Sequence, residues 1–428
     1  MKILITGTTG ESMPPPYGGV PKLSLLVAGV WRKMGHSVAI NFVYRPTKSD
    51  DLGAGAEYFF DFSSKPTKFK KIFFLLKNFF RNPILYAKLF ASYYRISSGH
   101  ALSETILYSA YGVHMDKIIE AWKPDIILAE AVLIKTYMVA VVARRRGIPI
   151  VYDSYAEVHD LSMGINKHLD ETQRVKYWKL FLELADLVVS AGPLCCRGPL
   201  MYLPKEKVTY VYDGSDYSLC NLDIKDDVGA LRDLLKLPKD QFLIGNVGSF
   251  ELRKGHDYLI RAIAILVKQG HKVGAVICGG SGDSTKWREL AKQEGVENNI
   301  HFFARLSELD LARVYKSLDA FSDLENTPRA CGFTMSVLEG MAMGLPVVVF
   351  ENPELFEAVK EGVNGFSVPI SDTEALAAAI LKMQQLSPER RHEMGQDASV
   401  RAKRIDIAFT AQGKMDLFNQ ILNSRKSN

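Results

Sequence analysis

Two hydrophobic patterns alternate along the first half of the chain. Short runs of consecutive apolar residues predict strands buried on both faces, and segments with apolar residues every three or four positions predict amphipathic helices. The predicted strands are 2–6, 37–43, 125–129, 149–152 and 187–189, and the clearest predicted helices are 22–33 and 132–146. Strands and helices that alternate in this way predict a parallel sheet with helices on both faces.

The second half of the chain repeats this alternation. Strands are predicted at 243–247, 273–278, 300–303, 320–322 and 346–350, and helices at 256–268, 309–317, 335–343, 373–386 and 405–422. We therefore predict an α/β fold with two Rossmann-like, doubly wound domains. Two such domains that face each other across a cleft place a ligand at the carboxyl ends of their strands.

The boundary between the domains is predicted between 211 and 237, where Asp213-Gly214-Ser215-Asp216 is followed by a charged segment. We assign 1–220 to an N-terminal domain and 221–404 to a C-terminal domain. The last segment, 405–428, is expected to form a helix that packs back on the N-terminal domain. A chain of 428 residues suits two domains of about 100–200 residues each.

Composition excludes several classes of protein. With 47% hydrophobic and 24% charged residues, the chain is globular rather than disordered. The net charge of +5 is mild and no RNA- or DNA-binding motif accompanies it, so no nucleic acid is expected as a partner. Neither a secretory leader nor an apolar run of about 18 residues is apparent, so we expect a cytoplasmic protein. The five cysteines lack zinc-site or redox-site spacing, and we expect reduced thiols.

The segment 248–255, Gly-Ser-Phe-Glu-Leu-Arg-Lys-Gly, follows a predicted strand and opens a predicted helix. Its glycines let the backbone approach a ligand, and Arg253 and Lys254 stand at the positive end of the helix, where phosphate is favoured. Gly18-Gly19 follows the first predicted strand, and Gly280 follows the strand 273–278. These two positions are weaker signals of the same kind.

The segment 333–346, Phe-Thr-Met-Ser-Val-Leu-Glu-Gly-Met-Ala-Met-Gly-Leu-Pro, predicts a loop, a helix, a glycine stop and a strand. Thr334 and the backbone amides beside it are candidates to meet a phosphate at the helix N-terminus. Glu339 lies in an apolar helix, where a carboxylate needs a partner. Ribose hydroxyls are suitable partners, and a structural ion pair is the alternative.

Taken in order, these segments resemble family 4 retaining glycosyltransferases of the GT-B fold, most strongly between 243 and 369. The resemblance implies that Lys254 binds phosphate and that Glu339, the second acid of the family's E-x7-E motif, binds the ribose. Gly18-Gly19 matches the family's N-terminal glycine loop. The donor-binding residues implied by the resemblance are Gly18, Gly19, Ser249, Lys254, Gly280, Cys331, Gly332, Phe333, Thr334, Met335 and Glu339.

Two donor-side positions depart from the family pattern. Cys331 stands where the first acid of the motif is expected, and Glu325, in a nearby Pro-containing loop, is the candidate to reach the same space. Ser249 stands where the family often has an arginine, and Arg253 is the candidate to compensate.

A third departure lies on the acceptor side. Tyr155 follows Asp153-Ser154 at a position where many relatives have a histidine. His159, four residues further on, is the candidate substitute, with a structural role as the alternative.

The resemblance implies transfer of a hexosyl group from a UDP- or GDP-linked sugar to a glycan or lipid-linked acceptor, with retention and without an essential metal. No tightly bound cofactor is implied, since the nucleotide sugar is a substrate. Charge stabilisation of the leaving diphosphate would carry most of the catalysis. The catalytic candidates are Lys254, Arg253, Glu325 and His159, and the acceptor-side candidates are Asp153, Tyr155 and Glu157.

The insertion 63–100 is basic and aromatic. No acidic residue occurs between Ser63 and Ser103, while basic residues recur from Lys65 to Arg95 among phenylalanines and tyrosines. This composition favours an interfacial helix on an anionic membrane, at the cytoplasmic face, with a helical hairpin packed on the N-terminal domain as the alternative.

Other classes of function stay open. Gly7-Thr-Thr-Gly10 resembles the start of an NAD-dependent nucleotide-sugar epimerase, but Met13 stands at the third glycine position and prolines follow. The departures at Cys331, Ser249 and Tyr155 are compatible with a catalytically impaired binding or partner protein of the GT-B fold.

Overall fold

The computed structural model describes residues 1–7, 19–44, 55–62, 67–96, 102–130, 134–154, 171–279, 282–326, 333–352, 354–355 and 358–426. The chain divides into two compact units, and each is described by itself. The first unit comprises Met1–Tyr212 together with Thr410–Asn428, and the second comprises Asp213–Phe409.

The first unit contains a seven-stranded sheet in the order β3-β2-β1-β4-β5-β6-β7, and every neighbouring pair is parallel. The strands are β1 (Lys2–Thr6), β2 (Ser37–Tyr44), β3 (Glu57–Phe62), β4 (Ile126–Glu130), β5 (Ile150–Ser154), β6 (Leu187–Ser190) and β7 (Val208–Tyr210). The strands β3 and β7 lie at the two edges, and the hydrophobic pattern did not predict them.

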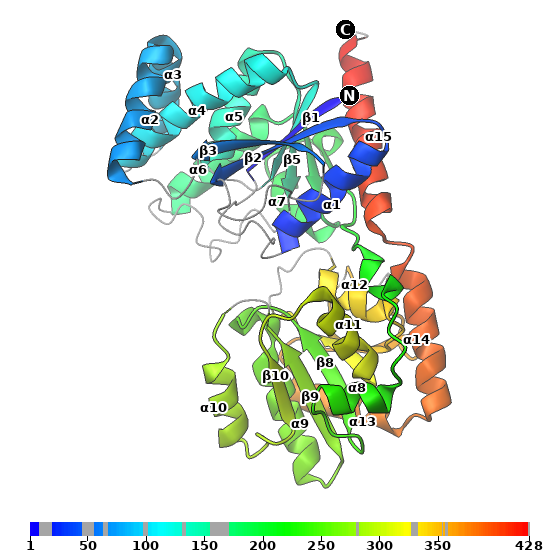
Figure 1. Ribbon diagram of the computed structural model, residues 1–428. Helices are drawn as coiled ribbons and strands as arrows, with labels where there is room; N and C mark the ends of the chain where they lie inside the picture. Colours follow the sequence, from blue (N-terminus) through cyan, green and yellow to red (C-terminus); the bar gives the residue numbers. More distant parts are fainter. Residues whose placement is uncertain are drawn as a thin grey trace. The chain divides into compact units, whose positions relative to one another are not determined.

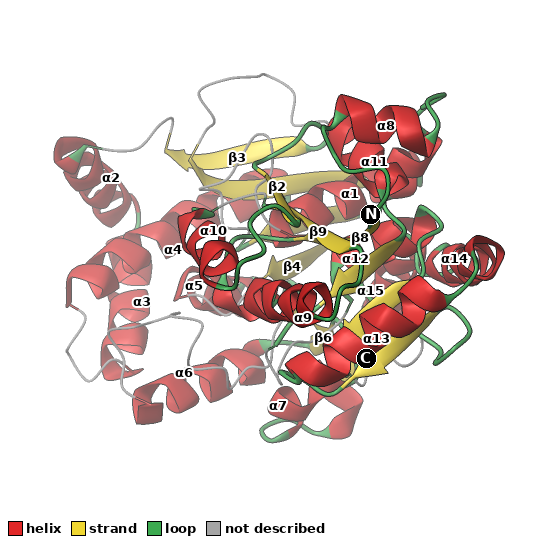
Figure 2. Cartoon of the chain, turned by 90° about the horizontal axis from the view of Figure 1, so that it is seen from below, coloured by secondary structure: helices red, strands yellow, loops and turns green. Residues whose placement is uncertain are grey.

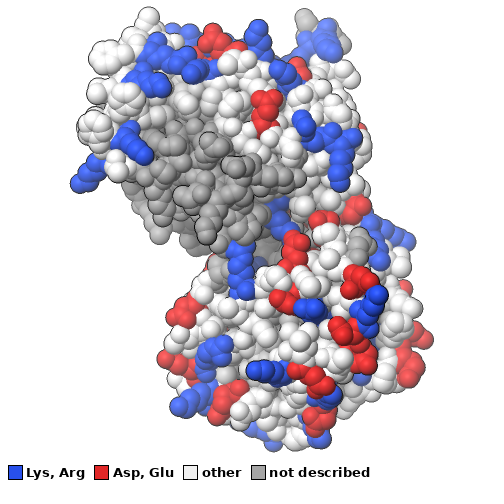
Figure 3. Space-filling view, in the orientation of Figure 1, with Lys and Arg blue, Asp and Glu red and all other residues white. Residues whose placement is uncertain are grey.

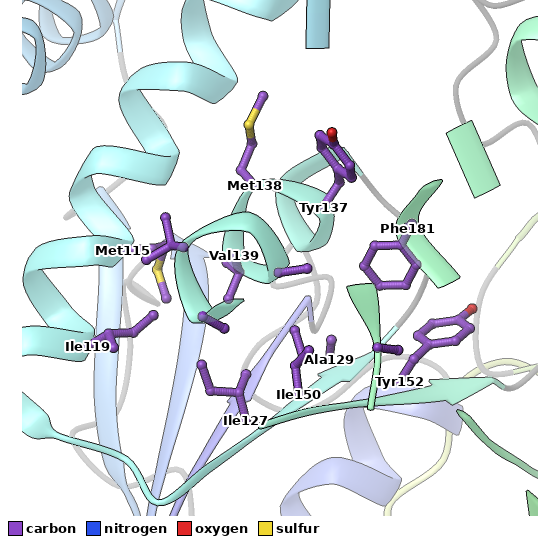
Figure 4. Close-up of a cluster of buried hydrophobic side chains, with 14 of the residues drawn as sticks. Met115, Ile119, Ile127, Ala129, Tyr137, Met138, Val139, Ile150, Tyr152 and Phe181 are labelled. Carbon is purple, nitrogen blue, oxygen red and sulfur yellow. The ribbon is translucent and has the colours of Figure 1, made fainter. Parts of the chain in front are cut away.

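The helices of the first unit cover both faces of this sheet (Figure 1). They are α1 (Gly19–Lys33), α2 (Lys68–Arg81), α3 (Pro83–Ile96), α4 (Leu102–Trp122), α5 (Ile134–Arg145), α6 (Glu171–Leu184), α7 (Arg197–Leu200) and α15 (Ile407–Lys426). On one face, side chains of α4, α5 and α6 pack on alternate residues of β4 and β5 (Figure 4). The residues between them are buried on the other face of the sheet, so a strand such as β4 has a continuous apolar sequence.

The C-terminal helix α15 packs within the first unit. Trp31 of α1 donates from its indole nitrogen to the carbonyl of Ala411 at 2.8 Å, and its ring lies 5.4 Å from that of Phe418. Lys414 forms an ion pair with Asp153 at the end of β5, at 2.5 Å. The helix therefore joins the second face of the sheet, beside α1.

The second unit contains a six-stranded sheet in the order β10-β9-β8-β11-β12-β13, again with parallel neighbours. Its strands are β8 (Phe242–Val247), β9 (Val273–Cys278), β10 (Ile300–Phe303), β11 (Ala320–Asp323), β12 (Val347–Phe350) and β13 (Gly365–Val368). Only the edge strand β13 was not predicted. The prediction of two doubly wound parallel units is confirmed.

The helices of the second unit (Figures 1 and 2) are α8 (Val228–Leu234), α9 (His256–Lys268), α10 (Thr285–Gln293), α11 (Glu308–Ser317), α12 (Met335–Ala342), α13 (Thr373–Gln385) and α14 (Pro388–Ala402). The chain runs from β8 outwards to β9 and β10, then returns to β11 on the other side of β8. The carboxyl ends of β8 and β11 thus flank the topological switch point, where open α/β sheets bind ligands.

The structure bears on two further sequence predictions, which concern the thiols and membrane-spanning helices. Cys196, Cys220 and Cys278 are free thiols, but Cys195 is disulfide-bonded, so the expectation of reduced thiols is wrong at Cys195. None of the helices within the described ranges is both long and apolar enough to cross a bilayer.

Candidate functional site

The loop that leaves β8 carries two cations to the N-terminus of α9. It contains a short 3-10 helix, Leu252–Lys254, and then Gly255 with a φ of 67°. A side chain at Gly255 would collide with the carbonyl of Leu324, so only glycine fits this turn. Gly248 likewise leaves room for the stem of Lys254, whose Cδ would lie 3.2 Å from an added Cβ. The local sequence therefore fixes where Lys254 stands.

Both cations converge on one carboxylate from the neighbouring strand. Glu325 follows β11 and lies 2.5 Å from Lys254 Nζ and 2.9 Å from Arg253 Nη1. Arg253 also binds Glu251 at 2.7 Å. Burial lowers the pKa of Arg253, but Glu325 and Glu251 outweigh it and raise this pKa. The result is a compact cluster of two cations and two carboxylates at the switch point.

Backbone contacts fasten the segment after β11 to the loop after β8. The amide of Asn326 donates to the carbonyl of Arg253 at 2.8 Å, and its side-chain nitrogen donates to the carbonyl of Leu252 at 3.1 Å. These two bonds do not involve the charged groups, and they hold the segment that carries Glu325 against the loop that carries the cations.

The N-terminus of α12 adjoins this cluster through β11. Thr334 caps the helix by accepting from the amide of Val337, and its hydroxyl donates to Asp323 at 2.6 Å. Burial raises the pKa of Asp323, while the charge of Lys254 opposes that shift. The first-turn amides of α12, like those of α9, add partial positive charge, which favours an anion.

Glu339 is buried on α12 and is oriented by a tyrosine. The hydroxyl of Tyr315 donates to Glu339 Oε2 at 3.2 Å, and Tyr315 itself is fully buried. Burial, and then the charge of Glu339, raise the pKa of Tyr315 well above its ordinary value, so it stays a donor. The carboxylate is thereby held in one orientation on the same helix whose N-terminus faces the cluster.

Some of the remaining predicted donor residues lie within the described ranges, and others lie outside them. Ser249 contributes its carbonyl, which accepts from His256 Nε2 at 3.0 Å, and Phe333 is buried before α12. Met335 opens α12, and Gly19 opens α1. The predicted residues that lie outside the described ranges are Gly18, Gly280, Cys331, Gly332, Tyr155, Glu157 and His159.

Asp153, a predicted acceptor-side residue, is buried in the first unit. Its side chain is 1% exposed and its Oδ2 binds Lys414 of α15. The structure thus places this carboxylate in the interior of the first unit, where it holds the C-terminal helix on the sheet. The partner lies 261 residues away in sequence, so the local pattern gave no sign of it.

Sequence reasoning did not single out Asp323, Tyr315, Asn326 or His256. For Asp323 a signal existed, since an acid directly at the end of a predicted strand beside the switch point is a ligand-facing position. His256 opens α9, is fully buried and has a lowered pKa because of this burial. Its role is to tie α9 to the carbonyl of Ser249, and hence to fix the cation loop.

Comparison with known proteins agrees with this geometry. Residues 228–401, which include the whole cluster, match the family model of glycosyl transferases group 1. A D-inositol 3-phosphate glycosyltransferase from Corynebacterium efficiens is 30% identical over 246 residues, which are 56% of this chain and 54% of that protein. The chain spans about half the length of the curated relatives it matches.

Solved structures cover nearly all of the chain. Sucrose-phosphate synthase from Thermosynechococcus elongatus has a TM-score of 0.71 at 17% identity and covers 99% of both chains. HepE from Anabaena, in complex with UDP and glucose, has a TM-score of 0.71 at 17% identity and covers 98% of this chain and 100% of its own. The fold is that of GT-B glycosyltransferases, as the sequence predicts, and the family match supports a glycosyltransferase. Neither finding favours an epimerase or a non-catalytic partner protein.

Proposed function

We propose that the protein transfers a sugar from a UDP- or GDP-linked donor to a glycan or lipid-linked acceptor. The observation that carries this proposal is the pair of cations, Lys254 and Arg253, at the switch point of the second sheet. They directly precede α9 and both contact Glu325, which follows β11, while α12, whose cap Thr334 bonds Asp323 of β11, carries the buried acid Glu339. A nucleoside diphosphate needs such groups, namely fixed positive charge for the diphosphate and a carboxylate for the ribose hydroxyls.

In this proposal Glu325 is the group that the diphosphate displaces. Without a ligand, Glu325 neutralises Lys254 and Arg253, with Glu251 as a second partner of the arginine. A diphosphate brings more negative charge than one carboxylate and competes for the same nitrogens. Glu325 is then released beside the donor, where it can accept a hydrogen bond from a sugar hydroxyl and so serve where Cys331 cannot.

The chemistry rests on leaving-group stabilisation. As the bond between the sugar and the diphosphate breaks, negative charge grows on the phosphate oxygens. Preorganised cations and helix N-termini stabilise this charge, and removal of one such donor typically costs about a hundredfold to a thousandfold in rate. We propose that Lys254 is the main donor, that transfer retains the anomeric configuration of a hexosyl group, and that no metal ion is essential.

The ribose is proposed to bind at Glu339. A carboxylate accepts from both ribose hydroxyls at once, and the hydrogen bond from Tyr315 keeps it oriented. The acceptor is proposed to bind on the first unit, with His159, Tyr155 and Glu157 as the candidate contacts. Asp153 stays a predicted contact, although its carboxylate is paired with Lys414.

The direct test is calorimetric titration of the purified protein with UDP, GDP, ADP and NAD. We expect one nucleoside diphosphate to bind, and binding to be lost in Lys254→Ala and Glu339→Ala. Lys268→Ala is the matched control, because Lys268 is an exposed lysine at the C-terminal end of α9, the helix that follows Lys254. Absence of binding by any diphosphate contradicts the donor site, and binding of NAD alone supports an epimerase.

Turnover then tests the finer statements. The matching nucleotide sugar is incubated with candidate glycan and lipid-linked acceptors, with and without EDTA, and the product is examined by NMR. Retention of the anomeric configuration and activity in EDTA support the proposal. Donor binding without turnover of any acceptor supports the impaired binding protein instead.

A further inference from the structure

The helix α2 presents its apolar face to solvent. Its large apolar residues with high exposure are Phe69 (78%), Ile72 (52%), Phe73 (62%), Leu76 (51%), Phe79 (41%) and Phe80 (74%). At 3.6 residues per turn these positions fall on one continuous face of the helix. A surface helix ordinarily turns such a face towards the core, whereas α2 exposes it to solvent.

The opposite face of α2 is firmly attached to the protein. The buried residues of α2 are Phe74 and Asn78. Phe74 packs edge-on against His114 of α4, with ring centroids 5.5 Å apart. Within α2, the side-chain nitrogen of Asn78 donates to the carbonyl of Phe74 at 2.8 Å. The exposure of the six apolar side chains is therefore a property of the folded unit.

The neighbouring helix α3 is also packed on the first unit. Asn82, between the helices, accepts from the amide of Leu85 at 3.0 Å and so caps α3. From there Leu85, Leu89 and Tyr93 form a buried stripe. In the views of Figures 1 and 2 the helices α2 and α3 lie at the outer edge of the first unit, with α4 between them and the sheet.

Basic side chains border the apolar face of α2 on both sides. With the geometry of an α-helix, Lys68 follows one border, and Lys70 and Lys77 follow the other. All three are exposed, and no acidic residue occurs between 63 and 103. Figure 3 shows Lys and Arg over this corner of the first unit, beside uncharged side chains. The surface is thus apolar at its centre and positively charged along its borders.

We propose that α2 is an interfacial membrane helix that inserts its apolar face into an anionic lipid surface. The helix has 14 residues and is about 21 Å long, which suits a position in the plane of the interface. Large aromatic side chains enter the boundary between headgroups and acyl chains, while lysines extend to the anionic headgroups. A second copy of the same face is a poor occupant, because it would bring like charges together along both borders.

This inference goes beyond the proposed function and does not depend on it. None of the donor-site residues lies on α2, and the helix belongs to the first unit. A membrane-bound α2 would bring the first unit to lipid-linked molecules, whatever chemistry the second unit performs. Binding to vesicles is measured without donor or acceptor, so failure of one proposal leaves the other standing.

The first experiment is sedimentation of the full-length protein with vesicles. Mixed phosphatidylcholine–phosphatidylglycerol vesicles are compared with pure phosphatidylcholine, at low and high salt. We expect binding only to the anionic vesicles. Each lysine near the surface contributes roughly a fivefold factor, so Lys68→Gln with Lys77→Gln, one from each border, weakens binding by about thirtyfold. Phe73→Ser with Phe80→Ser weakens it by at least about tenfold.

Matched controls come from exposed residues of the second unit. Lys286→Gln with Lys292→Gln removes two exposed lysines of α10, and Phe409→Ser removes a phenylalanine that is 50% exposed. Both controls are expected to bind vesicles like the wild type. Equal binding of all variants overturns the proposal, as does equal binding to neutral and anionic vesicles. Self-association in solution that is lost in the Phe73→Ser, Phe80→Ser variant also overturns it, in favour of a second copy.

A second experiment tests insertion rather than adsorption. The four native tryptophans are at most 7% exposed, so they report little from a surface. A Phe73→Trp variant adds one tryptophan on the apolar face, and Phe409→Trp is its control. We expect brominated lipid in anionic vesicles to quench the added fluorescence in Phe73→Trp only. Salt-sensitive binding without this quenching contradicts insertion.

Discussion

The carboxyl edges of the two sheets use charged side chains in opposite ways. In the first unit, strand-end carboxylates are buried and bound from within: Ser24 of α1 donates to Glu130 at 2.6 Å, and Lys414 binds Asp153. In the second unit the cations stand at the edge, and the side chain of Arg253 keeps 46% exposure. Doubly wound topology creates an edge that can bind anions, but the sign and burial of the side chains decide whether it does.

The largest expected effect concerns the buried pair of the first unit. Lys414→Met leaves the carboxylate of Asp153 without its cation in a nearly dry site, and loss of one partner of a buried pair costs about 3–5 kcal/mol. Denaturant unfolding measures this cost. The double variant Lys414→Met, Asp153→Leu is the control, because removal of both charges should recover most of the stability.

The Lys414→Met variant also tests whether the sheet edges of the two units act independently. If the edges are independent, folded Lys414→Met protein binds nucleoside diphosphate as the wild type does. A destabilisation below about 1 kcal/mol would show that the pair does not fix α15 in the way the comparison requires.

A pH effect of intermediate size is expected in the first unit. Burial, with a contribution from Lys117, lowers the pKa of His114 to about 4 from an ordinary value of 6.5. Below pH 6.5 the unfolded chain takes up a proton that the folded chain refuses, so stability falls by about 1.4 kcal/mol per pH unit until pH 4. At pH 5 the loss is about 2 kcal/mol.

The measurement is denaturant unfolding between pH 7 and pH 4.5, with His114→Gln as the control. The variant lacks the titrating group, so its stability should fall less over this range. Parallel pH profiles for the two proteins would contradict the assignment of the effect to His114. Because Phe74 of α2 packs on this ring, vesicle binding is best measured near pH 7.

The smallest effect is expected at the tyrosine that orients Glu339. Tyr315→Phe removes one hydrogen bond to a buried carboxylate, which costs about 1–2 kcal/mol of stability. Nucleoside diphosphate affinity should fall as well, since Glu339 loses its fixed orientation. Tyr258→Phe is the matched control, because Tyr258 packs through its ring on Phe350. Equal affinities in the two variants would mean that Tyr315 serves stability alone.

The fold was largely predictable because its information is local. Continuous apolar runs such as 346–350 specify strands buried on both faces, and glycine ends the preceding helix. The strands that were missed, β3, β7 and β13, are sheet edges. Their sequences, EYFFDF, VTY and GFSV, are short or mix polar with apolar residues, so they lack the continuous apolar run of the central strands; the fourth edge strand, β10, was predicted.

The site was predictable in part for the same reason. Lys254, Thr334 and Glu339 stand in motifs that a helix N-terminus and its strand impose over a few residues. The partners of these residues do not belong to the same local motifs. Tyr315 lies 24 residues from Glu339, and Glu325 lies 71 residues from Lys254. Only the fold brings such pairs together, and the proposed exchange role of Glu325 rests on the ion pairs that the fold creates.

The central claim is that Lys254 and Arg253 form a diphosphate site that Glu325 occupies when no ligand is bound. It is tested most directly by titrating UDP and GDP into Glu325→Gln, Lys254→Ala and wild type. The account predicts opposite signs: Glu325→Gln frees the cations and tightens binding by about fivefold to tenfold, whereas Lys254→Ala loses it. Weaker binding in Glu325→Gln, or unchanged binding in both variants, would contradict the account.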